Sequence, residues 1–198
     1  MGTETWIVIA LVVIAIVYVI YVYNKLTSFQ TQYENGFAQI ETQLKRRHDL
    51  IPNLVNTAKG YLDHEASVLK EVTEARAAAE KAVDAAHDRP GNPETMDLLA
   101  RAESALTSGL GRLNATFEAY PDLKADANMR QLAEELATTE NRVAYARQAY
   151  NDLVQKYNEY RRSFPPVVVG KFVGHGEDAQ LLEFEDSEAI QKAPEVSF

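Results

Sequence analysis

Two kinds of hydrophobic patterning divide the chain. Residues 6–23, WIVIALVVIAIVYVIYVY, are eighteen consecutive positions without a charge, a glycine or a proline. As a helix this run would be about 27 Å long, close to the roughly 30 Å of a bilayer's hydrocarbon core. A single span in lipid must satisfy its backbone hydrogen bonds internally, so it has to be a helix. We therefore predict a transmembrane helix rather than a buried strand or core helix, since soluble strands seldom exceed about ten residues.

Aromatic residues stand at both ends of this run, with Trp6 at one end and Tyr18, Tyr21 and Tyr23 at the other. Such residues collect at membrane–water interfaces, and we predict that these four lie there. A cleaved signal peptide is the alternative. The first five residues, however, contain no Lys or Arg, and no small-residue cleavage site follows the run. We expect residues 1–23 to form an uncleaved anchor.

Beyond the run, apolar residues recur at intervals of three and four. Up to residue 47 they are Leu26, Phe29, Tyr33, Phe37, Ile40 and Leu44. This single helical stripe has no break signal, so the membrane helix and the first bundle helix are predicted to be one rod. Pro52 lacks an N–H and crowds the preceding turn. We predict a turn there, with Asp49 as N-cap of a second helix; the alternative is a proline kink in one continuous helix.

Three further helices are predicted. The second covers residues 50–86 and is followed by a loop over residues 88–94 that contains two prolines and a glycine. The third begins near residue 94 or 95 and ends at residue 120. The fourth, residues 126–162, alternates apolar spacings of three and four throughout, which is typical of left-handed helix packing. A Phe-Pro-Pro sequence ends it.

The chain is therefore predicted to be all-α. An N-terminal transmembrane helix, residues 1–23, continues into an antiparallel bundle of about four long helices over residues 24–162. The remaining residues 163–198 form an acidic tail, which we expect to be extended with at most a short strand. The tail could lie along the bundle or reach another protein, and full disorder is the alternative.

Charge narrows the range of partners. The net charge is −9, and residues 163–198 hold 2 Lys or Arg against 7 Asp or Glu. An acidic chain with an acidic tail argues against a nucleic-acid partner. The cations nearest the run, beginning with Lys25, all follow it, so the positive-inside tendency favours a cytoplasmic bundle.

No residue pattern points to catalysis, a cofactor or a metal. The chain has no cysteine, and it contains no phosphate-binding glycine motif or nucleophile elbow. His64 and Glu65 open like a zinc-protease motif. Val68 stands where the second histidine ligand would be needed, so the motif fails.

One dense basic run, Lys45, Arg46, Arg47 and His48, is the candidate partner contact. It could hold an acidic segment, including the tail of a neighbouring copy. The alternative is a solvated helix end, where cations offset the carbonyl dipole.

Several stretches carry a family resemblance: YNKL after the anchor, QLKRRHDLIPNLVNTAKGYLDHE, EAYPDLKAD, TTENRVAYARQAYNDLVQKYNEY, FPP and PEVSF. They resemble the LemA family of bacterial membrane proteins, in the family's order and over nearly the whole chain. Residues 73–110 carry little resemblance, and residues 181–184 depart from the family's aromatic-rich stretch. The resemblance implies a single N-terminal span, an antiparallel bundle of long helices and a bacterial membrane location. It supplies no catalytic residue, because the family has no established enzymatic activity.

We therefore expect a non-enzymatic, single-pass structural or interaction protein of the bacterial inner membrane that assembles into a homo-oligomer. Its expected partners are the lipid bilayer and other copies of itself. The alternative is an adaptor that docks a membrane enzyme, such as a protease, through the acidic tail or the Lys45–His48 turn.

Overall fold

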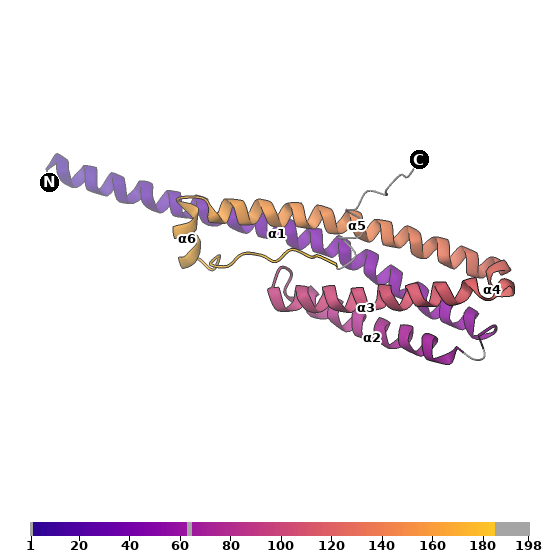
Figure 1. Cartoon of the computed structure of the whole chain (residues 1–198). Helices are drawn as coiled ribbons and strands as arrows, with labels where there is room; N and C mark the ends of the chain where they lie inside the picture. The colour runs from indigo at the N-terminus through magenta and orange to yellow at the C-terminus, as the bar shows by residue number, and fades with distance from the viewer. Residues whose placement is uncertain (1, 63–64, 185–198) are drawn as a thin grey trace, which may run out of the picture.

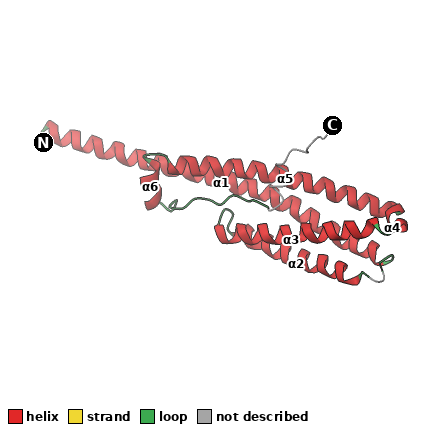
Figure 2. Ribbon diagram, in the orientation of Figure 1, coloured by secondary structure: helices red, strands yellow, loops and turns green. Residues whose placement is uncertain are grey.

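The computed structural model of the chain describes residues 2–62 and 65–184 (Figure 1). Within these residues every regular element is a helix, as Figure 2 shows, and the predicted all-α fold is confirmed. His64, which opens the failed zinc motif, lies outside the described residues. The helices are α1 (Thr3–Lys59), α2 (Ala66–Asp88), α3 (Pro93–Glu118), α4 (Pro121–Ala125), α5 (Ala127–Arg162) and α6 (Pro166–Phe172).

Helix α1 continues through Pro52, so the predicted turn with Asp49 as N-cap is wrong. A helical residue at position 52 would normally donate its N–H to the carbonyl oxygen of His48, and proline has no N–H to give. The Nε atom of Arg76 on α2 donates to that oxygen instead, at 2.8 Å. A side chain from another helix therefore replaces the missing bond. The second helix consequently begins at Ala66 rather than near residue 50.

Helices α1 and α5 lie side by side along most of the length of α5 (Figure 1). They approach closely at Gly36, where an added Cβ would lie 3.0 Å from Cδ1 of Leu153 and 3.5 Å from Cα of Tyr150. The predicted stripe of α1 forms this interface: Phe37 is 1% exposed and stacks edge-on against Tyr150. The absence of a side chain at Gly36 thus lets the two helices pack at short distance.

Helices α2 and α3 form a hairpin that covers the half of α1 remote from its N-terminus (Figure 1). The predicted loop between them is present, and the side chain of Asn92 accepts hydrogen bonds from the amides of Glu94 and Thr95 to cap α3. Asp126 caps α5 in the same way through the amide of Met129, at 2.9 Å. These caps account for the helix starts that the sequence pattern placed within a few residues.

The N-terminal part of α1 projects beyond the bundle (Figure 1). It is the helix of the described chain that is long and apolar enough to cross a membrane. Its side chains are exposed up to Tyr21, and Val22 is the first that is fully buried. Trp6 is 63% exposed at one end of the run, and Tyr18, Tyr21 and Tyr23 are exposed near the other; their place at a membrane interface stays a prediction.

The beginning of the tail departs from the expectation of an extended chain, because Pro166–Phe172 forms α6. After a turn at residues 173–174, the chain up to residue 184 forms no helix or strand and runs along the bundle from α6 towards the loop between α2 and α3 (Figure 1). Pro166 suits the first turn of a helix, where no N–H is needed. Residues 185–198, which hold four of the seven acidic residues of the tail, lie outside the described part of the chain.

Candidate functional site

The basic run lies inside α1 and is divided between surface and interior. Lys45 is exposed and pairs with Glu41 one turn away, at 2.6 Å, and Arg46 is also exposed. Arg47 is 4% exposed and His48 1% exposed. The run is therefore neither a turn nor a helix end, and two of its four members face the interior. Its contact with a partner stays a prediction.

Glu103 of α3 pairs with both buried basic side chains, Arg47 and His48. Its carboxylate is fully buried, with Oε1 2.8 Å from Nε2 of His48 and Oε2 3.5 Å from Nη1 of Arg47. Arg47 also donates from Nη2 to Oγ1 of Thr107, at 3.0 Å. Buried ion pairs contribute little net stability, but removal of one partner is costly because a charge stays uncompensated. This cluster can therefore set the register of α3 against α1.

The same cluster is not fully paired. Nδ1 of His48 and Oε2 of Glu103 are buried and have no hydrogen-bond partner among the described residues. Buried polar atoms in proteins are nearly always satisfied, frequently by an ordered water. A water molecule or a polar ligand atom at this point would complete the bonding.

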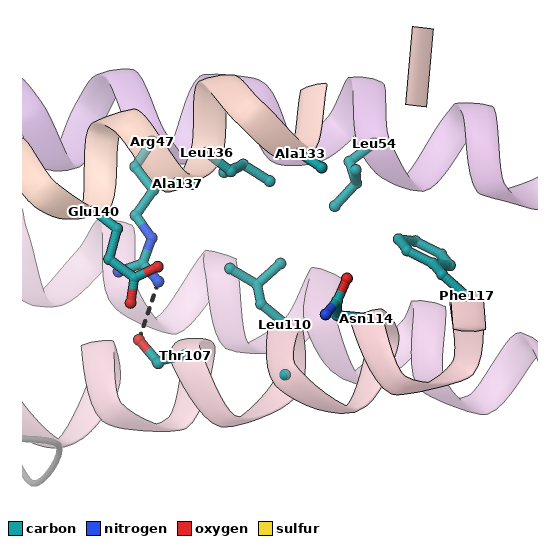
Figure 3. A pocket seen from close by; sticks show the side chains of 11 residues that line it. Arg47, Leu54, Thr107, Leu110, Asn114, Phe117, Ala133, Leu136, Ala137 and Glu140 are labelled. Carbon is teal, nitrogen blue, oxygen red and sulfur yellow. Dashed lines mark hydrogen bonds between the residues drawn. The ribbon is translucent and has the colours of Figure 1, made fainter. Parts of the chain in front are cut away.

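A groove opens beside the cluster between α1, α3 and α5 (Figure 3). Its volume is about 380 Å³. Side chains from all three helices line it: Arg47, Leu54, Thr107, Leu110, Gly111, Asn114, Phe117, Ala133, Leu136, Ala137 and Glu140. In Figure 3 the polar groups Arg47, Thr107 and Glu140 lie at one end, and Asn114 and Phe117 lie towards the other. Such a lining suits a mostly apolar segment that carries a few polar groups.

Further along α5, polar side chains bind the backbone of tail residues 179–182. Asn158 donates from Nδ2 to the oxygen of Ala179 and accepts from its amide, both at 2.9 Å. Asn151 makes the same pair of bonds with Leu182, at 3.1 and 2.9 Å. The hydroxyl of Tyr150 donates to the oxygen of Gln180, at 2.9 Å. We call Asn151 and Asn158 the asparagine clamp.

Charged contacts fix both ends of the clamped segment. Arg161 and Arg162 bind the carboxylate of Asp178, and they hold the pKa of that group below its ordinary value. At the other end, the guanidinium of Arg147 lies over the ring of Phe184, with Cζ 4.5 Å from the ring centroid. Part of the tail therefore does lie along the bundle, and one of its acidic residues is neutralised within the chain.

Sequence reasoning missed the clamp, although one signal was available. Asn151 and Asn158 are seven residues apart, so they share one face of a helix. The pattern does not say what that face contacts, because the partner backbone lies 21 to 31 residues further along the chain. In residues 2–62 and 65–184, no three His, Asp or Glu side chains gather as a possible metal site.

Comparison with known proteins identifies the family of this chain. The model of the LemA family matches residues 36–198. A relative named Protein LemA, from Metamycoplasma hominis, is 27% identical over 147 residues, which are 73% of this chain and 63% of the relative. The match thus spans less than two thirds of that relative's length. Because the family model covers most of the chain, including the groove and the asparagine clamp, this protein belongs to the LemA family.

Proposed function

We propose that this protein is a non-enzymatic, single-pass membrane-anchored structural or interaction protein that assembles into a homo-oligomer at the bacterial inner membrane. The observation that carries the proposal is the continuity of α1, which passes from an exposed apolar run into the bundle core without a break. A rigid connection of this kind holds the bundle surfaces at a defined height above a membrane. The LemA family is not a known enzyme family.

The orientation in this proposal rests on charge. Lys25 is the cation nearest the apolar run, and it lies on the bundle side. The positive-inside tendency then favours a cytoplasmic bundle.

Self-assembly requires a surface that the bundle itself does not use. The regularly spaced apolar residues of α5 mostly pack within the chain, since Val143, Tyr150 and Tyr157 are buried. Tyr145, on another face of α5, is 75% exposed. Exposed tyrosine is a frequent anchor of protein–protein interfaces. The assembly surface in this proposal is the face of α5 that carries Tyr145.

The test is the mass of the full-length protein in mild detergent, measured by light scattering with the detergent contribution subtracted. A discrete multiple of 22.1 kDa is expected. Tyr145→Glu should lower the mass, whereas Ala77→Glu, at an exposed position of α2, should not. A clean monomer across the accessible concentration range would overturn self-assembly.

The groove favours a second candidate, an adaptor that docks a membrane enzyme. Arg47 belongs to the basic run and also lines the groove, so one residue joins both features. Gly111 offers a selective test, because a Cβ added there meets nothing within 4 Å. Gly111→Leu should fill the groove and abolish co-purification of the partner, while Ala105→Leu, exposed elsewhere on α3, should leave it intact. Equal partner recovery with both variants would exclude the groove as the docking site.

A further inference from the structure

Helix α6 lies where the apolar run of α1 ends. It packs against both α1 and α5, and Figure 1 shows it lying across the long axis of α1. The ring of His175, which follows α6, lies 6.0 Å from that of Tyr23, one of the aromatics predicted at the membrane interface. A helix in this position would be roughly parallel to the surface of a membrane that α1 crosses.

The outer face of α6 is apolar and exposed. Val168 and Phe172, four residues apart on α6, are 49% and 85% exposed, and Phe164, two residues before the helix begins, is 82% exposed. The opposite face is turned inward, with Pro166 and Gly170 buried. Two phenylalanines this exposed, next to a longer apolar surface, indicate a face that is covered in the functional protein.

The contacts behind α6 hold this face in place. Gly170 accepts a hydrogen bond from the amide of His175, at 2.9 Å, and a Cβ at Gly170 would come within 2.9 Å of the oxygen of His175. The His175 ring is buried and lies 3.2 Å from the hydroxyl of Tyr157 through Nδ1. The exposed phenylalanines are thus presented by a packed element rather than by a loose end.

We propose that the exposed apolar face of α6, formed by Val168 and Phe172, inserts into the lipid interface beside the point where α1 leaves the bilayer, together with Phe164 in the preceding turn. The inference rests on the proposed membrane anchoring of α1. The bilayer is the occupant that the geometry selects, because this face continues the apolar surface of the anchor at the same height. Lys171, exposed on α6 itself, can reach lipid phosphates while the aromatic rings enter the acyl region.

The consequence is a second membrane contact. A bundle held by one helix can tilt and rotate about the point of exit. Insertion of α6 restrains both motions, and it fixes the side of the bundle on which the groove and the exposed face of α5 are presented.

Tryptophan fluorescence in vesicles tests the proposal, because Trp6 is the one tryptophan of the chain. The full-length protein is reconstituted into phosphatidylcholine–phosphatidylglycerol vesicles whose lipids are brominated near the top of the acyl chains. Quenching of Trp6 reports on the anchor. The double variant Trp6→Phe/Phe172→Trp reports on α6, and Trp6→Phe/Tyr145→Trp is the matched control. Position 145 lies 17 helical residues from the end of α5, a distance of about 25 Å from α6.

We expect the indole introduced at position 172 to lose roughly half of its emission in brominated relative to ordinary lipid, and the indole at position 145 to be unaffected. Quenching of Trp6 without quenching at position 172 would overturn the α6 contact and leave the anchor in place. Quenching at position 172 without quenching of Trp6 would support the α6 contact and refute the anchor. Absence of quenching at both positions would refute both.

Discussion

The Nε atom of Arg76 donates a hydrogen bond of 2.8 Å to the backbone oxygen of His48, the carbonyl that Pro52 leaves without a helical partner. Two helices are thereby joined at a position inside α1 where the helix cannot satisfy its own backbone. The continuity of α1 therefore depends on α2.

A double-mutant cycle tests this dependence. Arg76→Met should lower the free energy of unfolding by about 1–3 kcal/mol, because the His48 oxygen loses its donor. In a Pro52→Ala background the helix supplies that donor, so the same substitution should cost clearly less. Urea unfolding followed by circular dichroism in mild detergent measures both steps.

Arg101→Met is the control for the cycle, since Arg101 forms an exposed ion pair one turn from Asp97 and should change stability by less than about 1 kcal/mol. An equal cost of Arg76→Met in the two backgrounds would contradict the proposed role of Pro52.

The buried carboxylate of Glu103 provides a second prediction. Glu103→Ala leaves Arg47 and His48 buried without their partner, and it should cost about 3–5 kcal/mol. Glu71→Ala removes an ion pair with Arg112 that is about half exposed, and it should cost no more than about 1 kcal/mol. Thermal unfolding of the two variants makes the comparison. Similar losses would mean that the Glu103 cluster is not the register-setting contact described above.

The asparagine clamp can be tested by amide hydrogen exchange. Asn158→Ala removes two hydrogen bonds to Ala179, and at about 0.5–1.5 kcal/mol each the Ala179 amide should exchange roughly fivefold to a hundredfold faster. Asn158→Asp keeps the acceptor for that amide and should have a smaller effect. Asn141→Ala, at an exposed position of α5, should leave the exchange unchanged. Unaltered protection of Ala179 in Asn158→Ala would argue that the tail is held by other contacts.

Docking of the segment around His175 should depend on pH. Burial lowers the pKa of His175 from its ordinary value of 6.5. The released state therefore takes up a proton before the docked state does. Stability is fully present above pH 6.5 and is lost as the pH falls from that value through the lower pKa of the docked state. The loss is measured as a fall in the protection of the amides of residues 173–176 against hydrogen exchange between pH 7.5 and 5. His175→Phe should remove the pH dependence of this protection.

Two glycines inside helices should respond in opposite ways to the same substitution. Gly111→Ala should stabilise the protein by about 1 kcal/mol, because the new methyl group meets open space and alanine is the better helix former. Gly36→Ala should gain nothing or lose stability, because its Cβ would press on Leu153 at 3.0 Å. Thermal unfolding of the pair checks the difference, and an equal gain would show that α1 and α5 are packed less tightly than the structure has them.

The helices themselves were predictable from the chain, because helical periodicity and apolar run length are local properties. The stripe from Leu26 to Leu44 packs as its spacing indicates, and the fourth predicted helix, α5, ends before the Phe-Pro-Pro sequence. The interactions that form these helices join residues a few positions apart. The family assignment also followed from local information, because it rests on stretches of contiguous sequence.

Tertiary contacts decided what near neighbours cannot encode. Pro52 remains helical because Arg76 comes from another helix, and half of the basic run is buried because Glu103 on α3 lies opposite it. The clamp, the groove and the position of α6 arise in the same way, from pairs separated by about 20 to more than 100 residues. Which side chains meet across such separations depends on how the helices pack, and a periodic stripe shows that a face is buried without showing what covers it.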